Sequence, residues 1–119
     1  MGFLSIFRKS KSVSVIQLNG VIAPNMGRRK GLNLQELEKT LEQAFTGSNI
    51  QAVALQINSP GGSPVQSEMI SLRIRELSEK NNIPVLAFVE DVAASGGYWL
   101  ACSADEIFAS NASIVGSIG

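Results

Sequence analysis

Short apolar runs and longer segments of helical periodicity alternate along the chain. Residues 52–57 and 84–89 are almost continuously apolar, which is the pattern of parallel strands buried on both faces. Residues 13–18 predict a first strand and residues 106–109 a short last one. Helical segments separate these strands, so the order of elements predicts an α/β domain with a largely parallel sheet.

The first two helices carry clear start and stop signals. Asn33 is an expected N-cap, and apolar side chains follow it at helical spacing until Gly47, where this helix should end. Ser63 and Gln66 form the pattern of a capping box at the start of the second helix. That helix should end at residues 81–82.

One face of the second helix and a single cysteine are expected in the core. Val65, Met69, Leu72 and Leu77 lie broadly on one face of the second helix, and charged residues occupy the other. Cys102 lies in a short apolar segment that predicts a third helix. We therefore predict a buried cysteine rather than a reactive thiol.

Glycine-rich turns follow the second and third strands. Residues 58–64 form the first, and Ser95 followed by Gly96 and Gly97 forms the second. A serine at a strand-to-helix turn can project its oxygen into a cleft, and neighbouring backbone N–H groups can stabilise an oxyanion. Taken alone, however, the local pattern at Ser95 favours a simple helix N-cap.

The glycine turns together resemble peptidase family S49, the signal peptide peptidase A type that is also called protease IV. The resemblance is carried in order by Asn58–Pro64, Val92–Asp105 and Ser113–Gly119, and it extends over nearly the whole chain from about Val13. It implies a Clp/crotonase-type ββα spiral fold. It also implies a serine endopeptidase that acts on peptides such as residual signal peptides.

The resemblance assigns roles to four residues. Ser95 corresponds to the nucleophile. Gly61 and Gly62 in the first turn, together with the N–H of Gly96, correspond to the oxyanion and substrate-binding groups. These assignments favour a nucleophile over an N-cap at Ser95.

The chain departs from this family in its general base. It contains no histidine, which excludes a Ser-His-Asp triad within it, and the family it resembles uses a lysine that follows the serine. The lysines of this chain, which all precede Ser95, are Lys9, Lys11, Lys30, Lys39 and Lys80. Lys30 is the one loop candidate, and we expect it to be exposed. We predict that the base is absent from this chain and that the isolated chain is nearly inactive.

The two ends of the chain carry separate predictions. Residues 1–12 form a basic segment that is expected to be a disordered tail with weak contact to a membrane surface, and residues 13–119 form the N-terminal part of the peptidase-like domain. The apolar, glycine-punctuated end predicts that the domain continues beyond Gly119. The sequence contains neither a signal peptide nor a transmembrane pattern, which favours a cytoplasmic or peripherally membrane-associated protein.

Composition narrows the function further. The 119 residues suit one domain, and 10 basic against 10 acidic residues provide no electrostatic case for nucleic-acid binding. A single cysteine and no histidine exclude a disulfide framework and a metal-ligand cluster within the chain. The glycines match neither a P-loop nor a dinucleotide fingerprint, so no cofactor is expected.

Two alternatives to a peptidase stay open at this point. The run Gly96–Asp105 also resembles crotonases, in which paired backbone N–H groups stabilise a thioester enolate, so an acyl-CoA-binding enzyme is one alternative. The other is a non-catalytic subunit or fragment that forms a homo-oligomer or assembles with a full-length homologue.

Overall fold

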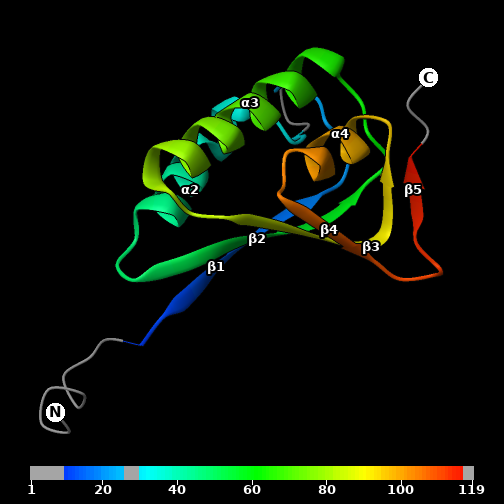
Figure 1. Ribbon diagram of the computed structural model, residues 1–119. Coiled ribbons are helices and arrows are strands. Elements are labelled where there is room, and N and C mark those ends of the chain that lie inside the picture. The colour runs from blue at the N-terminus through cyan, green and yellow to red at the C-terminus, as the bar shows by residue number, and fades with distance from the viewer. Residues whose placement is uncertain (1–9, 26–29, 117–119) are drawn as a thin grey trace, which may run out of the picture.

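A computed structural model describes residues 10–25 and 30–116 and shows a parallel sheet with the helices on one side of it (Figure 1). The strands are β1 (Ser12–Asn19), β2 (Ile50–Ser59), β3 (Val85–Ala94), β4 (Glu106–Ala109) and β5 (Ile114–Gly116). The helices are α2 (Leu34–Thr46), α3 (Pro64–Asn81) and α4 (Gly96–Cys102). The predicted α/β fold with a largely parallel sheet is confirmed.

The sheet has the order β1-β2-β3-β4, and every pair of strands is parallel. β3 is long enough to have two successive neighbours on one side. Residues 86–89 pair with β4, and residues 92–94 pair with β5, which the sequence did not predict as a strand. Ala93 therefore lies between Ser59 of β2 and Val115 of β5, so the end of β3 is held on both sides.

The helix caps agree with the sequence except in one detail. The Asn33 side chain accepts a hydrogen bond from the Glu36 N–H, and the Ser63 hydroxyl accepts one from the Gln66 N–H. The reciprocal half of the predicted capping box does not form. Instead, Gln66 accepts a bond from the Leu34 N–H at the start of α2, which ties the first turns of α2 and α3 together.

The predicted core stripe of α3 is wrong. Val65, Met69 and Leu72 are 63%, 40% and 62% exposed, and only Leu77 of the predicted set is buried. The buried face of α3 consists of Ser67, Ile70, Ser71, Ile74, Leu77 and Ser78. The hydroxyls of these serines donate hydrogen bonds to backbone carbonyls, as that of Ser67 does to the Ser63 carbonyl at 2.7 Å. Small side chains therefore occupy the positions where α3 packs closely against its neighbours.

The prediction of a buried Cys102 is also wrong, because this cysteine is exposed. α4 has seven residues and turns Gly96, Gly97, Leu100 and Ala101 toward the protein interior. Cys102 follows this buried set on the other side of the helix. Its apolar sequence neighbours therefore did not determine its burial.

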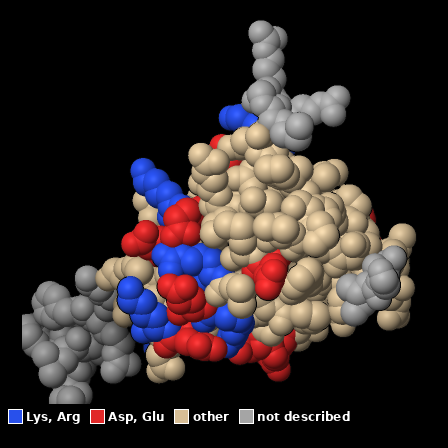
Figure 2. All heavy atoms as spheres, turned by 90° about the horizontal axis from the view of Figure 1, so that it is seen from above, with Lys and Arg blue, Asp and Glu red and all other residues tan. Residues whose placement is uncertain are grey.

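Charged side chains gather over one part of the helical side of the molecule (Figure 2). Arg73 of α3 forms ion pairs with Glu38 of α2 and with Glu76, each at 2.6 Å. α4, by contrast, contains no charged residue. None of the helices in the described ranges has the length and apolar character needed to span a membrane.

The first strand begins close to its predicted start. β1 begins at Ser12, one residue before the predicted strand, and the Ser12 N–H donates to Asn49. Residues 1–9, which hold most of the predicted basic tail, and residues 117–119 lie outside the described residues.

Candidate active site

The two glycine turns meet where β2 and β3 end. Because the strands are parallel, their carboxyl ends lie at one edge of the sheet, the usual place for ligand sites in open α/β sheets. Asn58 reinforces the junction, since its side-chain oxygen accepts a hydrogen bond from the Val92 N–H at 3.2 Å. This bond spans the point where the register of β2 and β3 shifts, between Ile57 and Ser59.

Ser95 is exposed and has an unusual backbone conformation directly after β3. Its φ is +53° and its ψ is −119°, a region that residues with a side chain rarely occupy and that costs about 1–3 kcal/mol. Ser95 stands at the N-cap position of α4, but its side chain makes no capping hydrogen bond. Among the described residues, its hydroxyl has no hydrogen-bond partner. The simple N-cap interpretation therefore does not explain the residue.

The Gly61–Gly62 turn packs directly against the Ser95 turn and against Ile22. A Cβ atom on Gly61 would lie 2.8 Å from the Ala94 oxygen and 2.8 Å from the Gly96 nitrogen. A Cβ on Gly62 would lie 2.1 Å from the Ile22 carbonyl oxygen. Both glycines also have positive φ values, +102° and +146°. The structure therefore accommodates no side chain at either position.

The backbone N–H groups of these glycines differ in their partners. The Gly61 N–H donates to the buried Ser59 hydroxyl at 3.1 Å and is therefore already used. Within residues 10–25 and 30–116, the N–H groups of Gly62 and Gly96 have no acceptor. Gly96 is buried, and a buried donor without a partner suits an acceptor supplied by a ligand. Two free amides from separate turns thus lie beside the serine.

α4 approaches β2 and α3 closely enough to require glycines in its first turn. A Cβ on Gly97 would lie 2.4 Å from the Ser59 carbonyl oxygen, and one on Gly96 would lie 2.3 Å from the Ser67 hydroxyl. The start of α4, and with it the Gly96 N–H, is therefore fixed by packing against two other elements.

The described residues place no base at Ser95. Lys30 is exposed, as predicted, and so are Lys11, Lys39 and Lys80. Among the described residues, no hydrogen bond joins any of these lysines to Ser95. Lys9 lies outside the described residues. The interaction with the Cys102 side chain raises the pKa of Tyr98, which disfavours its phenolate form. In the part of the chain that the structure describes, no hydrogen bond joins Tyr98 to Ser95. In the described part of the chain, no cluster of side chains could hold a metal ion.

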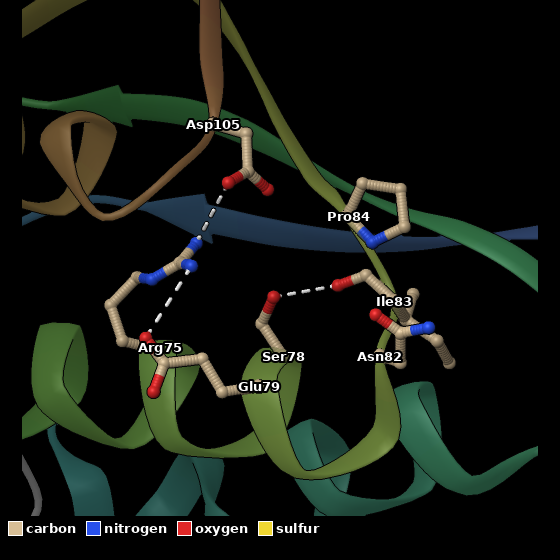
Figure 3. Close-up of a pocket in the computed structure, with 7 residues that line it drawn as sticks. All are labelled: Arg75, Ser78, Glu79, Asn82, Ile83, Pro84 and Asp105. Carbon is tan, nitrogen blue, oxygen red and sulfur yellow. Dashed lines mark hydrogen bonds and ion pairs between the residues drawn. The ribbon is translucent and has the colours of Figure 1, made fainter.

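A pocket of about 250 Å³ lies at the other end of β3, far along the strand from Ser95 (Figure 3). Its polar groups bond to one another: Arg75 donates to Asp105, and the Ser78 hydroxyl donates to the Ile83 carbonyl. The Asp105 carboxylate also accepts a 2.7 Å bond from the buried Val85 N–H. Asp105 lies in the turn between α4 and β4, and its bonds join the starts of β3 and β4.

We expect Asp105→Ala to lower the free energy of unfolding by about 1–3 kcal/mol, because the Val85 N–H would remain buried without an acceptor. Asp105→Asn keeps an acceptor oxygen and is expected to cost less. Urea denaturation of both variants measures the difference. Equal losses would show that the exposed Arg75 ion pair, rather than the Val85 bond, carries the effect.

The sequence of this chain matches a family of known proteins. The sequence profile described as Peptidase family S49 matches residues 78–119, which include Ser95 and Gly96. Protease 4 of Haemophilus influenzae is 33% identical over 116 residues, which are 98% of this chain and 19% of that protein. The chain belongs to peptidase family S49.

Another relative of this S49 chain has a different name. The Na(+)/H(+) antiporter NhaA of Brucella melitensis is 49% identical over 108 residues, which are 90% of this chain but 15% of that protein. That name refers to the whole antiporter protein. The S49 chain spans less than a fifth of the length of either relative.

The fold of the S49 chain also occurs in a solved structure. A mutant of a membrane-bound stomatin-specific protease superposes with a TM-score of 0.65, covering 89% of this chain and 47% of that chain at 20% sequence identity. At this identity the likeness concerns the fold alone. It supports the predicted Clp/crotonase-type assignment.

The structure brings the four predicted site residues of the S49 chain together and adds three that sequence reasoning missed. Ile22 contacts Gly62, Asn58 joins β2 to β3, and Ser59 occupies the Gly61 N–H. Asn58 and Ser59 stand in the first glycine motif, so their position there was a usable signal. Ile22 lies 40 residues before Gly62, and nothing in its local sequence indicates this contact.

Proposed function

We propose that this chain carries the nucleophile and the oxyanion-binding amides of an S49 serine endopeptidase that acts on peptides such as residual signal peptides. The observation that carries the proposal is the strained backbone of Ser95 next to the N–H groups of Gly62 and Gly96. Among the described residues, neither the Ser95 hydroxyl nor these two N–H groups has a hydrogen-bond partner. An exposed serine on a strained strand-to-helix turn is typical of a nucleophile.

In the proposed reaction, the Ser95 oxygen attacks the carbonyl carbon of the peptide bond. The carbonyl oxygen becomes an oxyanion, which the Gly62 and Gly96 amides stabilise by hydrogen bonds. The leaving amine takes up the proton that the serine lost, and water then hydrolyses the acyl-enzyme. Gly61 has a separate role: without a side chain, it allows the first turn to lie against Ser95.

The general base in this proposal is a lysine outside the described residues. The described lysines are exposed and make no hydrogen bond with Ser95. A second copy of the chain would carry only the same lysines. We therefore propose that a full-length homologue, assembled with this chain, supplies this lysine.

The test is covalent labelling with a fluorophosphonate probe, followed by mass spectrometry to locate the modified residue. In this reaction the serine oxygen forms a bond to phosphorus, fluoride leaves, and a base takes the serine proton. We expect slow labelling at Ser95, acceleration by millimolar concentrations of a small primary amine that substitutes for the lysine, and no such labelling in Ser95→Ala.

The Ser95→Ala variant also serves as the control for folding, because its circular dichroism spectrum should match that of the parent chain. A folded chain whose Ser95 does not react, with or without added amine, would contradict the peptidase proposal. The crotonase-like alternative uses the same paired amides, and the family match favours the peptidase over it.

A further inference from the structure

The Gly62 amide owes its orientation to a single residue of the preceding segment. The Ile22 N–H donates to the Gly61 carbonyl at 2.9 Å, and the Ser63 N–H donates to the Ile22 carbonyl at 2.7 Å. In an extended chain, the C=O of one residue and the N–H of the next residue point to opposite sides. Because the Gly61 carbonyl points toward Ile22, the N–H of the next residue points away from Ile22. That residue is Gly62, whose N–H therefore has no acceptor within the described residues.

The segment at Ile22 is held in turn on its other side. The Ala23 N–H donates to the Leu32 carbonyl and the Leu32 N–H donates to the Val21 carbonyl, both at 2.9 Å. Ile22 itself is 1% exposed. The backbone at Ile22 therefore bridges Leu32 and Gly62, and the position of the oxyanion-binding turn depends on where Leu32 lies.

Asn33, the next residue after Leu32, fixes this position through its side chain. It is 1% exposed, and its amide nitrogen lies 3.1 Å from the Ala23 carbonyl oxygen, 3.0 Å from the Asn25 side-chain oxygen and 3.2 Å from the Gly31 carbonyl oxygen. These acceptors belong to the two strand-like segments that pair at Ile22 and Leu32. One side chain therefore joins both segments.

The same side chain also fixes the start of α2. Its oxygen accepts a 3.0 Å bond from the Glu36 N–H. The adjacent Leu34 N–H donates to Gln66 in the first turn of α3, four residues after Gly62. Asparagine suits this position because its oxygen accepts while its amide nitrogen donates two hydrogens. Aspartate has no hydrogen to donate, and the single short hydroxyl of serine cannot replace the amide nitrogen while it caps the helix.

We propose that Asn33 is a positioning residue for the oxyanion-binding turn, acting through Leu32 and Ile22 on the Gly62 amide. The catalytic consequence of this inference rests on the proposed function, whereas the contacts of Asn33 are independent of it. Asn33 does not touch the substrate. Its loss should loosen the Ile22 segment and leave the Gly62 N–H less well directed, while the sheet stays intact.

The test compares Asn33→Ser with Ser78→Ala in the whole chain. Serine retains the helix cap, so Asn33→Ser removes the three donated contacts with little effect on the start of α2. Asn33→Asp is a second variant of the same shape that also keeps the cap. Ser78→Ala removes one buried hydrogen bond, to the Ile83 carbonyl, at the opposite end of α3 from Gly62 and is the matched control.

Two readouts are used, of which the first does not depend on catalysis. Amide hydrogen exchange should show protection at Ile22 and Ser63 falling at least about 10-fold in Asn33→Ser, with protection of β2 and β3 core amides unchanged. The second is fluorophosphonate labelling, in which the maximal rate should fall about 10-fold or more while the probe concentration at half-maximal rate stays constant. Ser78→Ala should change neither local protection nor the maximal rate.

Each other outcome has a definite meaning. Unchanged protection at Ile22 and Ser63 in both Asn33 variants would overturn the inference, as would an equal loss across the whole sheet, which would indicate a general stabilising role. If the parent chain does not label at Ser95, the proposed peptidase function fails, and hydrogen exchange alone then decides whether Asn33 positions the turn.

Discussion

Replacing Gly62 by alanine should lower the rate of Ser95 labelling by a factor of about 100 or more, the loss typical of removing one oxyanion donor. The new Cβ would lie 2.1 Å from the Ile22 carbonyl oxygen and close to two further backbone atoms of the same residue. Backbone cannot rotate away as a side chain does, so the pairing with Ile22 must break. Labelling kinetics in the presence of added amine measure the effect.

Gly20→Ala is the matched control for this prediction. Gly20 also has a positive φ, +93°, but a Cβ there would meet nothing within 4 Å. The variant should therefore lose about 1–2 kcal/mol of stability from backbone strain alone and label at the parent rate. Parent-like labelling of Gly62→Ala would show that this amide is not an oxyanion donor.

Replacing Gly97 by alanine should lower the free energy of unfolding by about 2 kcal/mol or more, because of overpacking against a backbone atom. Helix propensity alone predicts the opposite sign, a gain of about 0.5–1 kcal/mol in α4. Overlap dominates because the Cβ would lie 2.4 Å from the Ser59 carbonyl oxygen, at the end of a strand held on both sides. Urea denaturation determines the sign, and labelling of Ser95 should slow as α4 shifts.

Gly47→Ala provides the comparison for this prediction. Its φ is −65°, and its Cβ would meet the flexible end of Ile50 at 3.2 Å. This variant should change stability by less than about 1 kcal/mol in either direction. A Gly97→Ala chain that is more stable than the parent would contradict the close packing of α4 against Ser59.

The sequence predicted the order of elements because that order is encoded locally. Runs of apolar residues marked β2 and β3, and Asn33, Gly47 and Ser63 marked helix ends, since caps depend on groups within a few residues. The glycine motifs likewise predicted Ser95, Gly61, Gly62 and Gly96 as site residues, and the structure brings these four to one edge of the sheet.

Predictions failed where burial depends on a distant neighbour. The buried face of α3 contains Ser67, Ser71 and Ser78, and a polar residue in the sequence gives no sign that a close helix contact will enclose it. Val65 and Leu72, which periodicity assigned to the core, are more than half exposed. Cys102 failed for the same reason, because one residue of offset on a short helix changes the face on which a side chain lies.

By itself, then, the sequence determined the α/β class, the helix caps and the residue types of the two glycine turns. Only the tertiary structure decided that the Gly61 N–H donates to Ser59, while those of Gly62 and Gly96 have no acceptor in the described ranges. It also decided that Ile22 and Asn33 support the turn. The reason is that a local pattern specifies φ, ψ and caps, whereas the partner of each backbone amide is set by the register of strands and loops that lie far apart in the chain.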